Sequence, residues 1–244
     1  FRRVLFRSGS MGVGDLTAFT TYITQILMSL MMVSMLFLQL SRALASSTRI
    51  TEVLKTDVDL TDENAGQKDK KVENGRVEFK NVSFKYYEKR KENVLENISF
   101  TAEPGEIVGI IGTTGSGKSS LVQLIPRLYD VTDGEVLVDG VNVKDYGLKN
   151  LRDGVGMVLQ KNVLFSGSIE ENLRWGDENA TMEEIRAAAD SAQADGFVNA
   201  FTDGYNMELG QGGVNVSGGQ KQRLCIARAL LKKPKILIDR KSVV

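Results

Sequence analysis

The chain has 244 residues, of which 42% are hydrophobic and 25% are charged. This length suits one core domain with an additional apolar segment, and equal numbers of basic and acidic side chains, 31 of each, give no indication of nucleic-acid binding. The single cysteine, Cys225, excludes an internal disulfide and favours a cytosolic domain, in which we expect it to be a small core residue.

The two ends of the chain follow no packing pattern. Residues 5–8 can be encoded CTC TTC CGA TCT, and the opposite strand, read one nucleotide out of frame, encodes Asp-Arg-Lys, the sequence of residues 239–241. We therefore interpret residues 1–8 and 239–244 as translated adaptor sequence that flanks a genuine segment, 9–238.

Residues 16–41 contain no charged side chain. At about 1.5 Å of rise per residue, a helix over this range exceeds the roughly 30 Å of bilayer hydrocarbon. The run is too long for a cleavable signal peptide, and a buried helix of a soluble protein is the remaining alternative to a membrane span. Hydroxyl and amide side chains favour packing against other helices rather than lipid. They are Thr20, Thr21, Thr24, Gln25, Ser29, Ser34 and Gln39.

Basic residues follow this apolar run closely. Arg42, Arg49 and Lys55 place its C-terminal end on the cytoplasmic side by the positive-inside rule. We assign residues 9–57 to the membrane helix and its cytoplasmic extension. The polar residues 58–74 are predicted to be a linker to the next domain.

A glycine-rich motif, G-x-x-x-x-G-K-S, lies between an apolar run at 107–111, predicted to be a buried strand, and a predicted helix at 118–128. Its backbone N–H groups can surround phosphate oxygens, Lys118 can reach the β- and γ-phosphates, and the Ser119 hydroxyl can bind Mg²⁺. A chance Gly/Ser turn is the alternative, which the strand and helix disfavour. The predicted ATP-binding loop comprises Gly112, Thr113, Thr114, Gly115, Ser116, Gly117, Lys118, Ser119 and Ser120.

A second glycine turn, Ser217-Gly-Gly-Gln, opens a segment 220–231 with apolar residues at helical spacing. Ser217 is the expected N-cap, so the first-turn N–H groups form a second anion site, or simply the start of an ordinary capped helix. Capping boxes at Ser168 and Thr181 predict two further helix starts.

With both motifs in place, residues 75–238 resemble the nucleotide-binding domain of an ATP-binding-cassette (ABC) exporter half-transporter of the multidrug or lipid-exporting type. The resemblance implies an α/β P-loop NTPase fold with a helical subdomain, preceded by one transmembrane helix. It implies that Tyr86 stacks on adenine, with Tyr87 as the rival, and that Gln160, after a strand at 155–159, contacts Mg²⁺.

The same resemblance implies that the chain works in a pair. The family signature would contact ATP held by a second half-transporter, in a homodimer or a heterodimer. It comprises Val216, in place of the usual Leu, Ser217, Gly218, Gly219 and Gln220. The implied surroundings are membrane lipid and a transported small molecule or lipid at the plasma membrane, with the nucleotide domain in the cytoplasm. Residues 208–213 match a loop that touches the membrane domain, although Gln211 stands where Glu is usual, and a solvated turn remains equally open.

The catalytic part of the family pattern is incomplete. Residues 235–238 match the start of the strand that in the family carries a Mg²⁺-binding Asp and then a catalytic Glu or Asp. Asp239 comes one position early, and we assign it to the flank. The sequence contains no histidine, so the family's γ-phosphate histidine is missing. We expect a domain truncated in this strand that binds ATP without turnover, while its intact parent hydrolyses ATP to drive export. A degenerate, non-hydrolysing subunit is the alternative; residues 16–41 argue against a soluble ABC ATPase.

Overall fold

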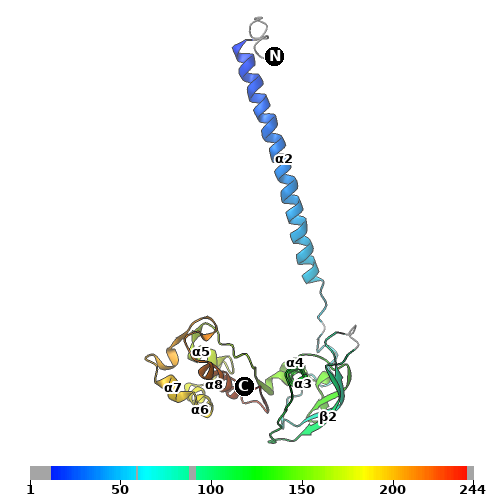
Figure 1. Cartoon of the computed structure of the whole chain (residues 1–244), viewed down its shortest axis with the longest axis vertical. Helices are drawn as coiled ribbons and strands as arrows, with labels where there is room; N and C mark the ends of the chain where they lie inside the picture. The colour runs from blue at the N-terminus through cyan, green and yellow to red at the C-terminus, as the bar shows by residue number, and fades with distance from the viewer. Residues whose placement is uncertain (1–11, 59, 88–91, 241–244) are drawn as a thin grey trace. The chain divides into compact units, whose positions relative to one another are not determined.

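The computed structural model describes residues 12–58, 60–87 and 92–240, which form two units divided between residues 59 and 60 (Figure 1). Of the expected flanks at 1–8 and 239–244, residues 1–8 and 241–244 lie outside the described residues. Asp239 is the last residue of strand β8 (Ile236–Asp239), and the Arg240 N–H donates to the Val158 carbonyl at 3.0 Å. Each unit has its own organisation.

The first unit is one continuous helix, α2 (Val13–Leu54), without a buried residue. It contains a window of mean hydropathy 1.8 and is long and apolar enough to cross a membrane. The five Thr and Ser hydroxyls that were expected to favour packing against other helices all donate to carbonyls three or four residues earlier in α2. These are Thr20, Thr21, Thr24, Ser29 and Ser34. Because these bonds are local, the hydroxyls by themselves do not require a neighbouring helix, which weakens that sequence argument.

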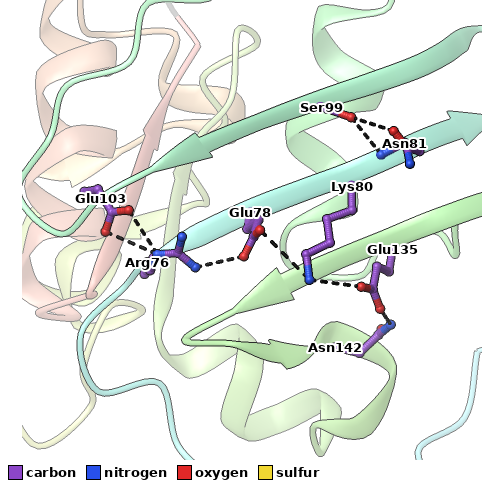
Figure 2. A network of polar contacts seen from close by, with 8 residues as sticks. All are labelled: Arg76, Glu78, Lys80, Asn81, Ser99, Glu103, Glu135 and Asn142. Atoms are coloured by element: carbon purple, nitrogen blue, oxygen red, sulfur yellow. Dashed lines mark hydrogen bonds and ion pairs between the residues drawn. The ribbon is translucent and has the colours of Figure 1, made fainter.

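The second unit begins with a four-stranded antiparallel sheet in the order β2-β1-β3-β4. The strands are β1 (Val77–Phe84), β2 (Leu95–Ala102), β3 (Asp133–Val138) and β4 (Val141–Asn142). Val77 and Phe79 and, after a register shift in the strand pairing, Val82 and Phe84 are buried in one core cluster. The other face carries the charged network drawn in Figure 2, in which Glu78 and Glu135 flank Lys80.

Two short sheets complete the strand pairing. Strand β5 (Val155–Val158) runs parallel to β8 (Ile236–Asp239), and β6 (Gly167–Ser168) pairs with β7 (Glu208–Leu209). The buried strand expected at 107–111 does not form, and that prediction was wrong. Ile107 and Ile111 are 97% and 98% exposed. Strand β8 pairs on one side only, with β5. No described strand pairs with residues 107–111, so the backbone of this segment lacks the hydrogen-bonding partner that defines a strand.

The helix after the glycine-rich loop is shorter than predicted. Helix α3 (Lys118–Leu124) ends four residues early, because Pro126 has no N–H to continue the ladder and Arg127 adopts a φ of 49°. Helix α4 (Leu148–Asp153) then leads into β5.

The remaining helices form a second core. They are α5 (Ile169–Arg174), α6 (Met182–Ser191), α7 (Asp195–Asn199) and α8 (Gly218–Leu231), with the 3-10 turns η2 (Gly204–Asn206) and η3 (Gln211–Gly213). The 3-10 turn η1 (Val143–Asp145) belongs to the first core, in which Val143 is buried. The capping boxes predicted at Ser168 and Thr181 form as expected. Cys225 is buried in this core, as predicted, and burial raises the pKa of its thiol.

The polar segment predicted to be a linker is fastened to the second unit from residue 60 onward. The Asp62 carboxylate accepts a hydrogen bond from the Leu148 N–H at 3.0 Å, and the Gln67 N–H donates to the Asp145 carbonyl at 2.8 Å. The Asn150 side chain donates to the carbonyl of Lys68 at 2.9 Å. These bonds order most of this segment against η1 and α4.

Candidate functional site

The glycine-rich loop contains two glycines in a left-handed backbone conformation. Gly115 and Gly117 adopt φ values of 87° and 84°, a left-handed conformation that glycine enters without steric cost. A Cβ atom on Gly117 would lie 2.8 Å from a Leu95 methyl carbon, and one on Gly112 would lie 2.7 Å from the Ser116 hydroxyl. Both conformation and space therefore require glycine at 117, conformation favours it at 115, and at 112 a side chain would force the Ser116 hydroxyl to move.

Lys118 holds this loop closed on itself. Its Nζ atom donates to the carbonyl oxygens of Gly112 and Thr113, each at 2.7 Å. Residues 112–116 are otherwise exposed. The ammonium group thus stands among loop carbonyls, and an entering phosphate would offer it a stronger, charged acceptor.

Tyr86 is brought to the helix that follows the loop. Its hydroxyl lies 2.8 Å from the hydroxyl of Ser120, which is buried on α3. The Tyr86 ring packs edge-on against Phe84 and Tyr129, at centroid distances of 4.8 and 5.0 Å. The hydrogen bond between the Tyr86 and Ser120 hydroxyls, which the sequence did not reveal, holds Tyr86 beside the loop. Stacking of Tyr86 on adenine stays a prediction.

Gln160 is exposed just beyond β5, and among the described residues no hydrogen bond joins it to the loop. The described part of the chain also holds no group of three or more Cys, Asp or Glu side chains that could bind a metal ion. Ser119 supplies one hydroxyl oxygen. A Mg²⁺ ion fits these residues only together with a nucleotide, because Mg²⁺ takes most of its oxygen ligands from phosphates and water at such sites.

The second glycine turn forms a complete capping box. Ser217 Oγ accepts from the Gln220 N–H at 3.2 Å, and Gln220 Oε1 accepts from the Ser217 N–H at 2.8 Å. Gly218 and Gly219 are exposed at the start of α8, with open space where a Cβ atom would stand. The Ser217 N-cap is as predicted, whereas the reciprocal role of Gln220 was missed, although S-x-x-Q signals it.

Val216 is buried in the second core, so this signature position contributes packing. The preceding loop is held by Asn215, whose side-chain oxygen accepts from the Gly210 N–H at 3.1 Å and whose amide donates to the Glu208 carbonyl at 2.8 Å. Gln211 is exposed in this loop. Sequence reasoning missed Asn215, which orders the turn before the signature.

Comparison with known proteins places this site in a family. A family model described as ABC transporter matches residues 95–239. The "Uncharacterized ABC transporter ATP-binding protein YfiB" of Bacillus subtilis is 48% identical over 231 residues, 95% of this chain and 40% of that protein. The ATP-dependent lipid A-core flippase of Pseudomonas aeruginosa is 41% identical over 236 residues, 96% of this chain and 38% of the flippase.

A solved structure, that of a bacterial Atm1-family ABC exporter with ATP bound, matches with a TM-score of 0.75 at 34% sequence identity. The match covers 93% of this chain and 40% of the exporter chain. The chain therefore spans about 40% of the length of the relatives it matches.

Proposed function

We propose that this chain, which belongs to the ABC transporter family, binds MgATP and that its hydrolysis in the intact protein drives export of a substrate across a membrane. The domain is an ABC P-loop NTPase domain of exporter type, preceded by a long apolar helix. One observation carries the proposal: a single chain combines the Lys118 loop, the Ser217-capped helix α8 and the apolar helix α2.

In this proposal Lys118 exchanges the carbonyls of Gly112 and Thr113 for the β- and γ-phosphate oxygens of ATP. The N–H groups of the glycine loop surround the phosphates, and Tyr86 holds the adenine ring. Ser119 and Gln160 are the proposed Mg²⁺ contacts. When bound, Mg²⁺ supplies positive charge that neutralises the charge developing on the phosphate oxygens.

The proposed partner is a second ABC half-transporter, identical or different, because domains of this family function as dimers. Ser217 and the N–H groups of the exposed Gly218 and Gly219 would contact the γ-phosphate of the partner's ATP. The protein would lie in the plasma membrane with this domain in the cytoplasm, surrounded by lipid, and would transport a small molecule or a lipid.

The alternative is a subunit with a degenerate site, which uses nucleotide to pair with a hydrolysing partner. The residue at the catalytic position after Ile238 in the full-length protein would decide between the two functions, because a Glu there favours hydrolysis and another residue favours the degenerate subunit. The intact capping box at Ser217 would serve the partner's ATP in either case.

Hydrolysis and binding measured on one sample separate these functions. The full-length protein that contains this chain is reconstituted in lipid nanodiscs and supplied with MgATP, with Lys118→Ala as the variant. Turnover that Lys118→Ala abolishes supports the transport ATPase. Nucleotide-dependent pairing without turnover supports the degenerate subunit, and neither binding nor pairing would overturn both.

A further inference from the structure

The Tyr86 ring lies against a second exposed tyrosine, Tyr129, which comes from a distant part of the chain. The two ring centroids are 5.0 Å apart and the ring planes meet at 88°, the edge-on arrangement that aromatic pairs favour. The buried Phe84 contacts both rings, Tyr86 at 4.8 Å and Tyr129 at 5.7 Å. The three rings form one cluster, in which Tyr86 and Tyr129 are each 41% exposed.

Backbone hydrogen bonds join the two segments that carry these rings. The N–H of Lys85, the residue before Tyr86, donates to the Thr132 hydroxyl at 3.1 Å. The Thr132 N–H donates in turn to the Ser83 carbonyl at 2.9 Å. The end of β1 therefore lies beside the segment that follows Tyr129, and the two rings meet because their backbones are joined.

Tyr129 stands on a turn that two arginines hold. The buried Arg127 forms a bidentate ion pair with Asp130, with Nε to Oδ1 at 2.7 Å and Nη2 to Oδ2 at 3.1 Å. Arg152 of α4 donates to the carbonyls of Pro126 and Arg127 at 3.1 and 2.9 Å. Tyr129 lies between the two members of the ion pair, so its backbone is fixed on both sides and its ring is a fixed neighbour for Tyr86.

The same turn continues from the helix of the glycine-rich loop. Helix α3 begins at Lys118 and carries Ser120, whose hydroxyl lies 2.8 Å from the Tyr86 hydroxyl. Tyr129 follows between α3 and β3. Tyr86 thus meets one continuous segment at two points, with its hydroxyl at Ser120 and its ring at Tyr129, and this segment also carries the lysine of the predicted phosphate site.

The two contacts differ in what a nucleotide would do to them. Ser120 belongs to the predicted ATP-binding loop, so its hydroxyl is a group that a phosphate can engage. The ring contact with Tyr129 involves no group that a phosphate needs. It can therefore restrict the side-chain torsions of Tyr86 both before and after a nucleotide enters, which avoids the loss of affinity that comes from ordering a free side chain on binding.

We propose that Tyr129 is a positioning residue for the nucleotide base: its ring, fixed by the Arg127–Asp130 pair, holds Tyr86 in the orientation that receives adenine. This inference rests on the proposed function, in which Tyr86 stacks on adenine. Because Tyr129 acts through Tyr86, it contributes to the binding of a nucleotide and leaves the binding of the phosphates alone unaffected.

The test compares two ligands on the full-length protein in lipid nanodiscs. One is MgATP and the other is magnesium tripolyphosphate, which offers three linked phosphates without ribose or base. Isothermal titration measures the Kd of each. We expect Tyr129→Ala to weaken MgATP binding by about three- to tenfold and to leave tripolyphosphate binding unchanged. Tyr129→Phe keeps the ring and should retain the affinity of the parent for MgATP.

A double-mutant cycle shows whether Tyr129 acts through Tyr86. In the Tyr86→Ala background, Tyr129→Ala should cause no further loss of MgATP affinity, because the ring that it positions is gone. Tyr129→Leu keeps apolar bulk without an aromatic edge and carries the test if Tyr129→Ala fails to fold.

Phe201→Ala is the matched control. It removes one ring of another edge-on pair, which Phe201 forms with Phe197 at 6.0 Å against the second core. This variant should lower the midpoint of thermal unfolding and change neither Kd.

Equal weakening of both ligands by Tyr129→Ala, or by Tyr129→Leu if only that variant folds, would show a purely structural role and overturn the inference. Additive losses in the cycle would also overturn it, since Tyr129 would then act independently of Tyr86. Unchanged MgATP affinity would overturn it and leave the proposed function intact. If Tyr86→Ala does not weaken MgATP binding, base stacking and this inference fall together; if the parent binds no MgATP, the proposed function falls as well.

Discussion

The two glycine turns of this domain are stabilised by different interactions. At Ser217 the helix start is stabilised entirely by local hydrogen bonds between residues 217 and 220, and the helix behind it is packed in its own core. At Gly112–Lys118 the loop follows an unpaired, exposed apolar run and is closed by a lysine on its own carbonyls. Local capping thus forms from short-range hydrogen bonds alone, whereas the strand predicted before the phosphate loop depends on pairing with distant residues, which 107–111 do not make in any described sheet.

The largest effect is expected at the loop. Lys118→Ala should weaken MgATP binding by about 10- to 100-fold, because it removes a charged hydrogen-bond donor worth roughly 1.5–3 kcal/mol. Isothermal titration of the full-length protein with MgATP measures this. Lys149→Ala, which removes an exposed lysine paired with Asp153, is the control and should leave affinity unchanged. Equal affinity in both variants would show that Lys118 does not contact phosphate.

Removing the Tyr86 ring tests whether the aromatic beside the loop serves the nucleotide. Tyr86→Ala should lose about 1–3 kcal/mol of ATP binding through the missing stacking interaction, whereas Tyr86→Phe keeps the ring and loses only the contact with Ser120. The same titration in Tyr87→Ala provides the comparison. A larger loss in Tyr87→Ala than in Tyr86→Ala would reverse the assignment.

The capped turn is expected to show a stability effect and a pairing effect together. Ser217→Ala should lower the free energy of unfolding by about 1 kcal/mol through loss of the N-cap. Thr181→Ala removes an equivalent capping box from α6 and should cost a similar amount. Only Ser217→Ala should also weaken ATP-dependent pairing, measured by light scattering of detergent-solubilised protein. Equal ATP-dependent pairing in the two variants would show that Ser217 only caps α8 and does not contact the partner's ATP.

The smallest expected effect is on the pH dependence of stability, and it is not seen at neutral pH. It arises from the fully buried Tyr146, whose hydroxyl donates to the Val138 carbonyl at 3.1 Å. Burial, assisted by the negative charge of Asp139, raises the pKa of Tyr146 from 10.0 to about 12. Between these values the folded chain keeps a proton that the unfolded chain has released, so stability is complete below pH 10 and falls as pH rises toward 12. Denaturant titrations across this range should show the fall, and Tyr146→Phe should make it shallower; an unchanged slope would contradict the assignment.

Sequence reasoning succeeded where the signal was local. The caps at Ser168, Thr181 and Ser217 and the burial of Cys225 follow from residue type and short spacing, and all are found. It failed at 107–111, where an apolar run was taken to be a strand, because pairing depends on residues distant in the sequence. It also extended the helix after Lys118 beyond Pro126, although proline should have marked its end.

By itself, the sequence determined the family motifs, the apolar length of α2 and the positions where glycine is required. Only the tertiary structure decided that Asp139 holds residues 73–76, that Tyr86 meets Ser120 and that the polar segment from residue 60 is fastened rather than free. The physical reason is range: backbone conformation and capping are settled within a few residues, whereas these contacts join side chains and backbone groups more than thirty residues apart, which only the packed fold brings within bonding distance.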